Sequence, residues 1–247
     1  MKKTVKEVIY MAFVSIFTIV ASGCGSDEPE QQNTDANGFE YVDLGLSVKW
    51  ASCNVGAKSP EEPGFLFAWG EVEPKEIFKP DDYKYSEKSE TGKLGYFYTK
   101  YCTDPACGTN DGITTLQKED DAAHVNMGGA WRMPTLMEIA ELMQNCKKEY
   151  VTVNESFCVK FIGPNGNFIL LPGLTATMMA KDSSGYYHIR TDSPETGGIW
   201  SSTLCVLYEQ AQWAGKALEF HSAYPSLVLG GANEYRWAGL AVRGVLE

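Results

Sequence analysis

The sequence is poor in the residues on which hydrolytic enzymes and metal sites depend. Its 247 residues include only three histidines, and none has the spacing of a Ser-His-Asp triad or of a metal-ligand pair. The seven cysteines contain no Cys-x-x-Cys pair. We therefore expect no catalytic residue, no bound metal and no cofactor. The three histidines are His124, His188 and His221.

Positive charge is also scarce. The chain has 21 lysines and arginines against 32 aspartates and glutamates, which gives a formal net charge of −11 at pH 7. A protein that binds nucleic acid needs a basic surface to replace the counterions of the phosphates. We therefore expect no nucleic-acid partner.

The N-terminal apolar run is too short to be a comfortable permanent membrane span. It extends from Val8 to Val20 and follows three lysines, a pattern typical of a signal-peptide core. The run ends in Ala21-Ser22-Gly23-Cys24, which reads as a lipobox. We predict that residues 1–23 are a lipoprotein signal peptide and that Cys24 is lipidated, with several acyl chains giving stable anchoring. The alternative is an ordinary secretory signal with a chance cysteine.

The residues after Cys24 have almost nothing to bury. Residues 24–38 are therefore expected to form a lipidated, flexible tether. The acidic segment Gly25-Ser26-Asp27-Glu28-Pro29-Glu30 resembles the surface-export signal of some Gram-negative lipoproteins, although a plain solvated tether fits as well. The expected location is the outer membrane, at the cell surface, with the periplasmic face as the alternative.

Six cysteines are left when Cys24 is lipidated. An even number outside the cytoplasm permits disulfides, but six cysteines allow 15 pairings and the sequence does not choose among them. Cys102 and Cys107 flank Pro105 and could close a small loop, whereas Cys146 lies on an apolar helix face and is expected to be a buried thiol. The six are Cys53, Cys102, Cys107, Cys146, Cys158 and Cys205.

The most informative stretch is Gly128-Gly129-Ala130-Trp131-Arg132-Met133-Pro134-Thr135, which leads directly into a helical pattern. Thr135 and Glu138 have the spacing of a capping box, so the pattern predicts a helix over about Thr135 to Lys147. Its apolar residues recur at i, i+3, i+4 and i+7 and form one stripe. They are Ile139, Leu142, Met143 and Cys146.

The rest of the chain predicts one more helix followed by mostly antiparallel strands, an α+β pattern. The first helix is expected over Leu116 to Val125, with Asp120 and Asp121 as acids at its start. The turn Gly163-Pro164-Asn165-Gly166 predicts a hairpin of Val159–Ile162 and Phe168–Leu171. The other expected strands are Tyr41–Trp50, Phe65–Trp69, Tyr186–Ile189, Ile199–Thr203, Ala217–Phe220, Leu227–Leu229 and Leu240–Leu246.

Several motifs accompany this helix start in a fixed order, and together they resemble known lipoprotein families. The set is similar to the FISUMP-type major paralogous domains of bacterial lipoproteins and to DUF1566-type domains. Both resemble the C-type-lectin-like fold of formylglycine-generating enzymes and of retroelement-diversified variable proteins. The motifs are Tyr41–Ala57, Phe67–Glu71, Asp120-Asp121-Ala122-Ala123, Gly198–Thr203 and Arg236–Arg243.

The resemblance implies one C-type-lectin-like domain over residues 39–247, with Trp131 in its core. The resemblance favours a binding module over an enzyme. Formylglycine-generating enzymes have a redox cysteine pair with four residues between them close before their last strand, but Cys102 and Cys107 have that spacing upstream of the helix. We expect a non-catalytic, adhesin- or lectin-like protein for a protein or glycan ligand. The alternatives are a structural or fimbria-associated surface component and an enzyme related to formylglycine generation.

In variable proteins of this fold the C-terminal sheet and loops carry the ligand surface, and Gly198–Glu247 is the matching segment. We interpret its motif residues as structural framework: Trp200, Ser201, Ser202, Arg236, Gly239, Val242 and Arg243. Between them lie amphipathic aromatics and amides of the kind that binding surfaces use. The candidate ligand-binding residues are Tyr208, Gln210, Gln212, Trp213, Lys216, Asn233, Tyr235 and Trp237; about half could instead pack under the loops.

One other loop has oxygen donors that suit calcium. Asp104, Asn110 and Asp111 are clustered near Gly112, but their spacing is not that of an EF-hand. A solvated loop is the preferred interpretation.

Overall fold

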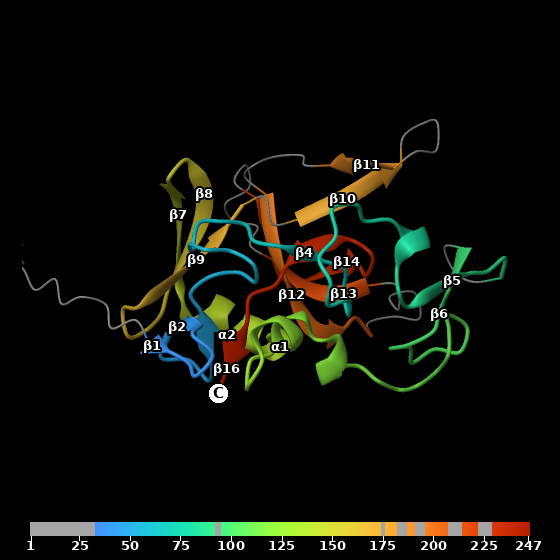
Figure 1. The fold of residues 1–247 in the computed structure, drawn as a ribbon, viewed down its shortest axis with the longest axis horizontal. Helices are drawn as coiled ribbons and strands as arrows, with labels where there is room; N and C mark the ends of the chain where they lie inside the picture. The colour runs from blue at the N-terminus through green and yellow to red at the C-terminus, as the bar shows by residue number, and fades with distance from the viewer. Residues whose placement is uncertain are drawn as a thin grey trace, which may run out of the picture. The chain divides into compact units, whose positions relative to one another are not determined.

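The strands of the described structure form four sheets. In this computed structural model the described residues are 33–91, 95–173, 176–181, 187–190, 196–206, 214–221 and 229–247. Within these ranges two α-helices accompany the sheets, so the fold class is α+β, as predicted (Figure 1). No helix in the described ranges is both long enough and apolar enough to cross a membrane.

The largest sheet has seven strands, and all but one of its pairings are antiparallel. Its order is β11-β10-β15-β12-β13-β14, with β4 paired to β15 and β12 parallel to β15. Strands β12, β13, β14 and β15 of this sheet belong to the segment in which the sequence places the ligand surface. The strands are β4 (Leu66–Phe67), β10 (Ala176–Lys181), β11 (Tyr187–Arg190), β12 (Thr196–Leu204), β13 (Ala214–His221), β14 (Leu229–Tyr235) and β15 (Gly239–Ala241).

Three smaller sheets complete the set. The four-stranded sheet has the order β1-β2-β3-β16, so the strand at residues 245–246 pairs with one near residue 50. The others are β5-β6 and β7-β8-β9. The strands are β1 (Asn33–Thr34), β2 (Glu40–Val42), β3 (Lys49–Ala51), β5 (Ser86–Lys88), β6 (Tyr96–Tyr98), β7 (Lys147–Val153), β8 (Ser156–Ile162), β9 (Phe168–Pro172) and β16 (Val245–Leu246).

The capping box at Thr135 is confirmed. Helix α2 (Leu136–Asn145) begins there, with the Glu138 amide donating to Thr135 Oγ1 at 3.3 Å and the Thr135 amide donating to Glu138 Oε2 at 2.7 Å. The predicted apolar stripe faces the core: Ile139, Leu142 and Cys146 are buried. The helix ends two residues earlier than predicted because Cys146 already has an extended backbone, after which β7 begins.

The prediction of a first helix over Leu116–Val125 is wrong in its bounds. A short 3-10 turn, η3 (Lys118–Asp120), comes first, and helix α1 (Ala122–Met127) follows it. Asp121 is the N-cap, because its carboxylate accepts the His124 amide at 2.9 Å and its own backbone is extended. A residue in that role cannot lie inside the helix.

Two predicted strands are broken by turns. The expected strand Tyr41–Trp50 is the pair β2 and β3, because Asp43 accepts the Gly45 amide at 2.7 Å and Gly45 has a φ of +73°. The expected strand Leu240–Leu246 divides into β15 and β16. The predicted hairpin is confirmed as β8 and β9, with Ile162 opposite Phe168. The sequence analysis missed strands β1, β5, β6, β7 and β10.

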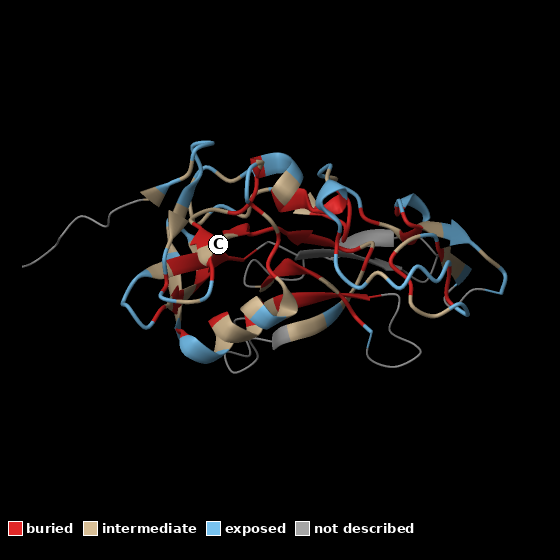
Figure 2. Cartoon of the chain, turned by 90° about the horizontal axis from the view of Figure 1, so that it is seen from below, coloured by how far each residue is buried: buried red, intermediate tan, exposed pale blue. Residues whose placement is uncertain are grey.

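The residues predicted to form the structural framework are buried in the core. Trp131 is fully buried, and all seven framework residues of the C-terminal segment are buried as well. Buried residues, red in Figure 2, gather on the inner strands, whereas exposed ones lie mostly in the surrounding turns and loops. The predicted signal peptide, Cys24 and the tether up to residue 32 lie outside the described residues.

Candidate functional site

The C-terminal segment is anchored by Arg236, a fully buried arginine. Its Nη1 donates to the carbonyl of Lys100 at 3.1 Å and its Nη2 to the carbonyl of Tyr101 at 2.5 Å. The guanidinium carbon lies 4.3 Å from the centre of the Tyr98 ring and 5.4 Å from that of Trp69. The cation is therefore held by two carbonyls and two aromatic faces rather than by a carboxylate.

Two aromatic side chains flank this arginine in sequence, and both pack against the core cluster that contains Trp69 and Tyr98. Tyr235 and Trp237 are half-buried, and their rings are stacked with centroids 5.1 Å apart and planes 23° apart. Asn233, on the same strand β14, is exposed. Three of the predicted ligand-binding residues thus lie within five positions of one another and keep some contact with solvent. Because the Arg236 side chain is held in the core, it fixes the backbone of Tyr235 and Trp237 on either side of it.

Lys216 does not lie on a solvent-facing surface, contrary to the sequence analysis. It is only 5% exposed, and its ammonium donates to Asn233 Oδ1 and, at 3.2 Å, to the carbonyl of Gly231. The Cys205 thiol donates to the same Asn233 oxygen at 3.2 Å. The long aliphatic stem of a lysine lets it be buried where its ammonium finds acceptors. Lys216 therefore orients Asn233 instead of meeting a ligand.

The remaining predicted site residues lie outside the described residues. They are Tyr208, Gln210, Gln212 and Trp213, all of which precede β13.

Two glutamates that the sequence analysis missed interact in the same sheet. Glu219 on β13 and Glu234 on β14 share a hydrogen bond. Burial and the neighbouring carboxyl raise the pKa of Glu219 to about 8, and burial raises the pKa of Glu234. Both shifts favour the protonated form of the carboxyl groups.

A second unpredicted cluster surrounds Asp120, whose carboxylate is buried. It accepts hydrogen bonds from Lys84 at 3.0 Å, Lys100 at 2.6 Å, Tyr101 at 2.7 Å and Tyr85. These hydrogen bonds outweigh the effect of burial, which would raise the pKa of Asp120, and they hold it at about 2. The cluster fastens the segment whose carbonyls bind Arg236.

The loop considered for calcium is braced by its own side chains. The Asp111 carboxylate accepts the amides of Tyr101 at 2.7 Å, Cys102 at 3.0 Å and Ile113 at 3.0 Å. Asp104 accepts the Cys102 thiol on its carbonyl at 3.1 Å and the Cys107 thiol on its carboxylate at 3.5 Å. Within the described ranges, no group of three or more acidic, histidine or cysteine side chains has the geometry of a metal site.

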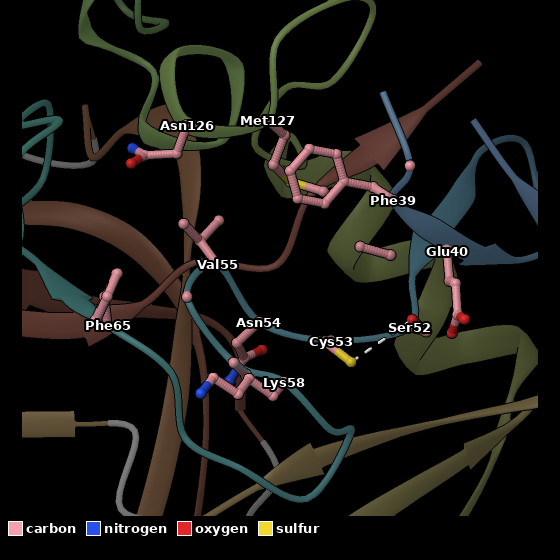
Figure 3. Close-up of a pocket in the computed structure, with 14 residues that line it drawn as sticks. Phe39, Glu40, Ser52, Cys53, Asn54, Val55, Lys58, Phe65, Asn126 and Met127 are labelled. Atoms are coloured by element: carbon pink, nitrogen blue, oxygen red, sulfur yellow. Dashed lines mark hydrogen bonds between the residues drawn. The ribbon is translucent and has the colours of Figure 1, made fainter. Parts of the chain in front are cut away.

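A pocket of about 420 Å³ opens elsewhere in the molecule, around Cys53 (Figure 3). Its lining comes from the first residue of β2 and the two residues before it, from the last residue of β3 and the loop that follows, and from the end of α1. Phe39 and Phe65 belong to this lining, and both are exposed, at 36% and 49%. The sequence analysis did not single out this pocket, since its walls come from distant segments.

Comparisons with known proteins found nothing similar to this chain: no family model, no curated protein and no solved structure matches it.

Proposed function

We propose that this chain is a lipid-anchored, non-catalytic binding module of the outer membrane surface, with a C-type-lectin-like fold. The ordered motifs that resemble FISUMP-type and DUF1566-like lipoproteins support the family and the fold. The lipobox at Cys24 supports the anchor. The proposed ligand is a protein or a glycan, bound by the C-terminal segment.

The observation that carries this proposal is the stacked pair Tyr235 and Trp237, held in place by the buried Arg236 between them. Large aromatic side chains contribute much of the energy of binding surfaces, because they bury a large apolar area while ordering only two torsions. A pair that is already ordered loses less entropy on binding than two free side chains. Asn233, oriented by Lys216, adds an amide beside the rings.

An array of glycans and of candidate surface proteins, probed with the full chain carrying Cys24→Ala to prevent acylation, tests the function. We expect saturable binding to one ligand class. Assembly of the chain with itself and no bound ligand would favour a structural or fimbria-associated component. A reactive pair at Cys102 and Cys107, mapped by alkylation of the native protein, would favour the enzyme alternative.

Single variants locate the site once a ligand is found. Tyr235→Ala and Trp213→Ala should each weaken binding by roughly 1–3 kcal/mol without changing the fold. Tyr150→Ala is a matched control, because Tyr150 is also half-buried and stacked on a ring, that of Phe157, with centroids 5.7 Å apart. Equal affinity for both variants and the control would place the site elsewhere on the molecule.

The anchor has a separate test. Metabolic labelling with a palmitate analogue should mark the wild-type chain and leave Cys24→Ala unlabelled. Equal labelling of the two chains would refute lipidation at Cys24.

A further inference from the structure

The pocket around Cys53 has walls whose chemistry favours a planar aromatic guest. The side chains of Phe39 and Phe65 supply two phenyl rings, Met127 supplies a thioether, and Cys53 supplies a thiol. In Figure 3, Phe39 and Met127 lie on one side of the view, Phe65 on the other, and Val55 between them. Rings prefer the edges and faces of other rings, and sulfur contacts with rings are favourable.

Both phenyl rings are held in place by neighbouring residues in the absence of a bound molecule. Phe39 meets Trp131 edge to face, with centroids 6.4 Å apart. Phe65 lies directly on the backbone of Gly56, where an added Cβ would be only 2.3 Å from the ring. Gly56 has a φ of +82°, so glycine serves both the turn and the close approach of the ring. Two large apolar side chains are thus fixed at the surface beside a cavity instead of being packed away.

The pocket also offers hydrogen-bond donors that the described residues leave unused. The backbone amides of Cys53, Asn54 and Gly56 donate to no acceptor in the described ranges, and neither does the exposed ammonium of Lys58. All four residues line the pocket, so an oxygen-bearing substituent on the ring suits the donors that they carry. Glu40 is the one acidic residue of the lining, so the pocket has no large net charge to exclude either sign.

The volume limits the size of the guest. A cavity of about 150 Å³ accommodates one benzene molecule, and ligand pockets begin at roughly 300 Å³. A pocket of about 420 Å³ has room for one or two fused rings with a short substituent.

We propose that this pocket binds a small mono- or bicyclic aromatic molecule with an oxygen-bearing substituent, its ring covering the Cys53 thiol. The site shares no residue with the Tyr235–Trp237 surface and does not depend on the proposed function.

Cys53 provides a direct readout, because it is the only one of the six described cysteines that is not buried. Burial raises the pKa of the Cys146 and Cys158 thiols to about 11, which slows their reaction further.

In the experiment, the full chain carrying Cys24→Ala is equilibrated with two probes that differ only in the ring. These are the mixed disulfides of cysteamine with 2-phenylethanethiol and with ethanethiol. Intact mass and peptide mapping then measure the two adducts at Cys53.

We expect the phenylethyl adduct to be favoured at least tenfold over the ethyl adduct. Phe65→Ala should reduce that preference at least threefold, whereas Ile77→Ala, which removes another exposed apolar side chain outside the pocket, should leave it unchanged. Gly56→Ala should also reduce it by displacing the Phe65 ring. Gly166→Ala is its control, since Gly166 has a φ of +91° but no atom near an added Cβ.

A non-covalent probe completes the test. Indole at millimolar concentration should slow the alkylation of Cys53 by iodoacetamide at least threefold, and Tyr235→Ala should not alter this protection. Equal adducts from the two disulfides, a preference that survives Phe65→Ala, or a thiol that reacts with neither probe would each overturn the proposal.

Discussion

The two ends of the motif Arg236–Arg243 hold the fold in different ways. Both arginines are fully buried, and no carboxylate binds either of them in the described ranges. Arg243 is satisfied by oxygen atoms: Asn54 Oδ1 at 2.8 Å and the carbonyls of Ala51 at 2.8 Å, Ser52 at 2.5 Å and Leu170 at 2.7 Å. Arg236 has two carbonyls and two rings, and its Nε has no acceptor in the described residues.

This difference separates a structural anchor from one that supports a surface. Hydrogen bonds to four oxygens fix Arg243 in direction as well as in position, and they tie the loop after β3 to β9. Burial lowers the pKa of Arg243 to about 10, which still leaves it charged at neutral pH. Ring faces around Arg236 constrain direction less, and its sequence neighbours Tyr235 and Trp237 are half-buried at the edge of the core. The same residue type therefore braces the core at one end and a candidate binding surface at the other.

The largest effect is expected from Arg243→Met. Four buried acceptors would lose their donor, and an unsatisfied buried polar group costs about 1–3 kcal/mol, so the free energy of unfolding should fall by roughly 3–5 kcal/mol. Urea unfolding followed by tryptophan fluorescence measures it. Arg243→Lys should restore only part of the loss, because an ammonium cannot reach all four oxygens. A lysine variant as stable as wild type would show that charge, not geometry, holds this anchor.

Arg236→Met should cost less, roughly 1–3 kcal/mol, because only two carbonyls lose a donor and the methionine side chain still packs against the rings. The same urea experiment gives the value. Once a ligand is known, this variant should also weaken binding, since the backbone between Tyr235 and Trp237 loses its anchor. If Arg236→Met proved costlier than Arg243→Met, the contrast drawn between the two anchors would be wrong.

The smallest effect among the three buried charged groups is expected at Asp120, which holds the segment bound by Arg236. Its folded-state pKa of about 2 lies below the ordinary value of 3.8. Its contribution is therefore present above about pH 4 and is lost as the pH falls from about 4 to 2. At pH 7, Asp120→Asn should lower the free energy of unfolding by about 1–2 kcal/mol, and the variant should lose less stability than wild type on acidification.

Asp81→Asn is the control for Asp120→Asn. Asp81 also binds a tyrosine and a lysine, Tyr96 and Lys88, and these contacts lower its pKa, but its side chain is 40% exposed. Exposed ion pairs contribute little, so this variant should change stability by less than about 0.5 kcal/mol. An equal acid response of the two variants would mean that burial adds nothing at Asp120.

Local patterns account for what the sequence predicts well. The capping box of Thr135 and Glu138 and the hairpin turn at Gly163–Gly166 depend on neighbours within a few positions. The burial of Trp131 and of the framework residues was expected from the resemblance of their motifs to known families. These features needed no knowledge of the tertiary structure.

What the sequence does not predict depends on contacts between distant segments. Asp120 was interpreted as a helix-start acid because its partners Lys84 and Lys100 stand 36 and 20 positions away. Lys216 has the polarity of a surface residue, but acceptors on the neighbouring strand β14 let it be buried. The pocket around Cys53 needs Met127 of α1 beside residues of the first strands. No sequence periodicity or short motif indicates these contacts between distant segments.

The pairing of β16 with β3 has a consequence for when the protein can fold. Trp50 pairs with Val245, and the hydrogen bond from Arg243 to the Ala51 carbonyl spans 192 positions of the chain. A ribosome delivers residues in order, so β3 exists for most of synthesis without its neighbour β16. Closing so long a loop is slow, and the contacts that stabilise the closed loop form only after the last strand has been made. Nascent chains of this protein should therefore be captured by chaperones and cut by proteases until residue 246 has emerged.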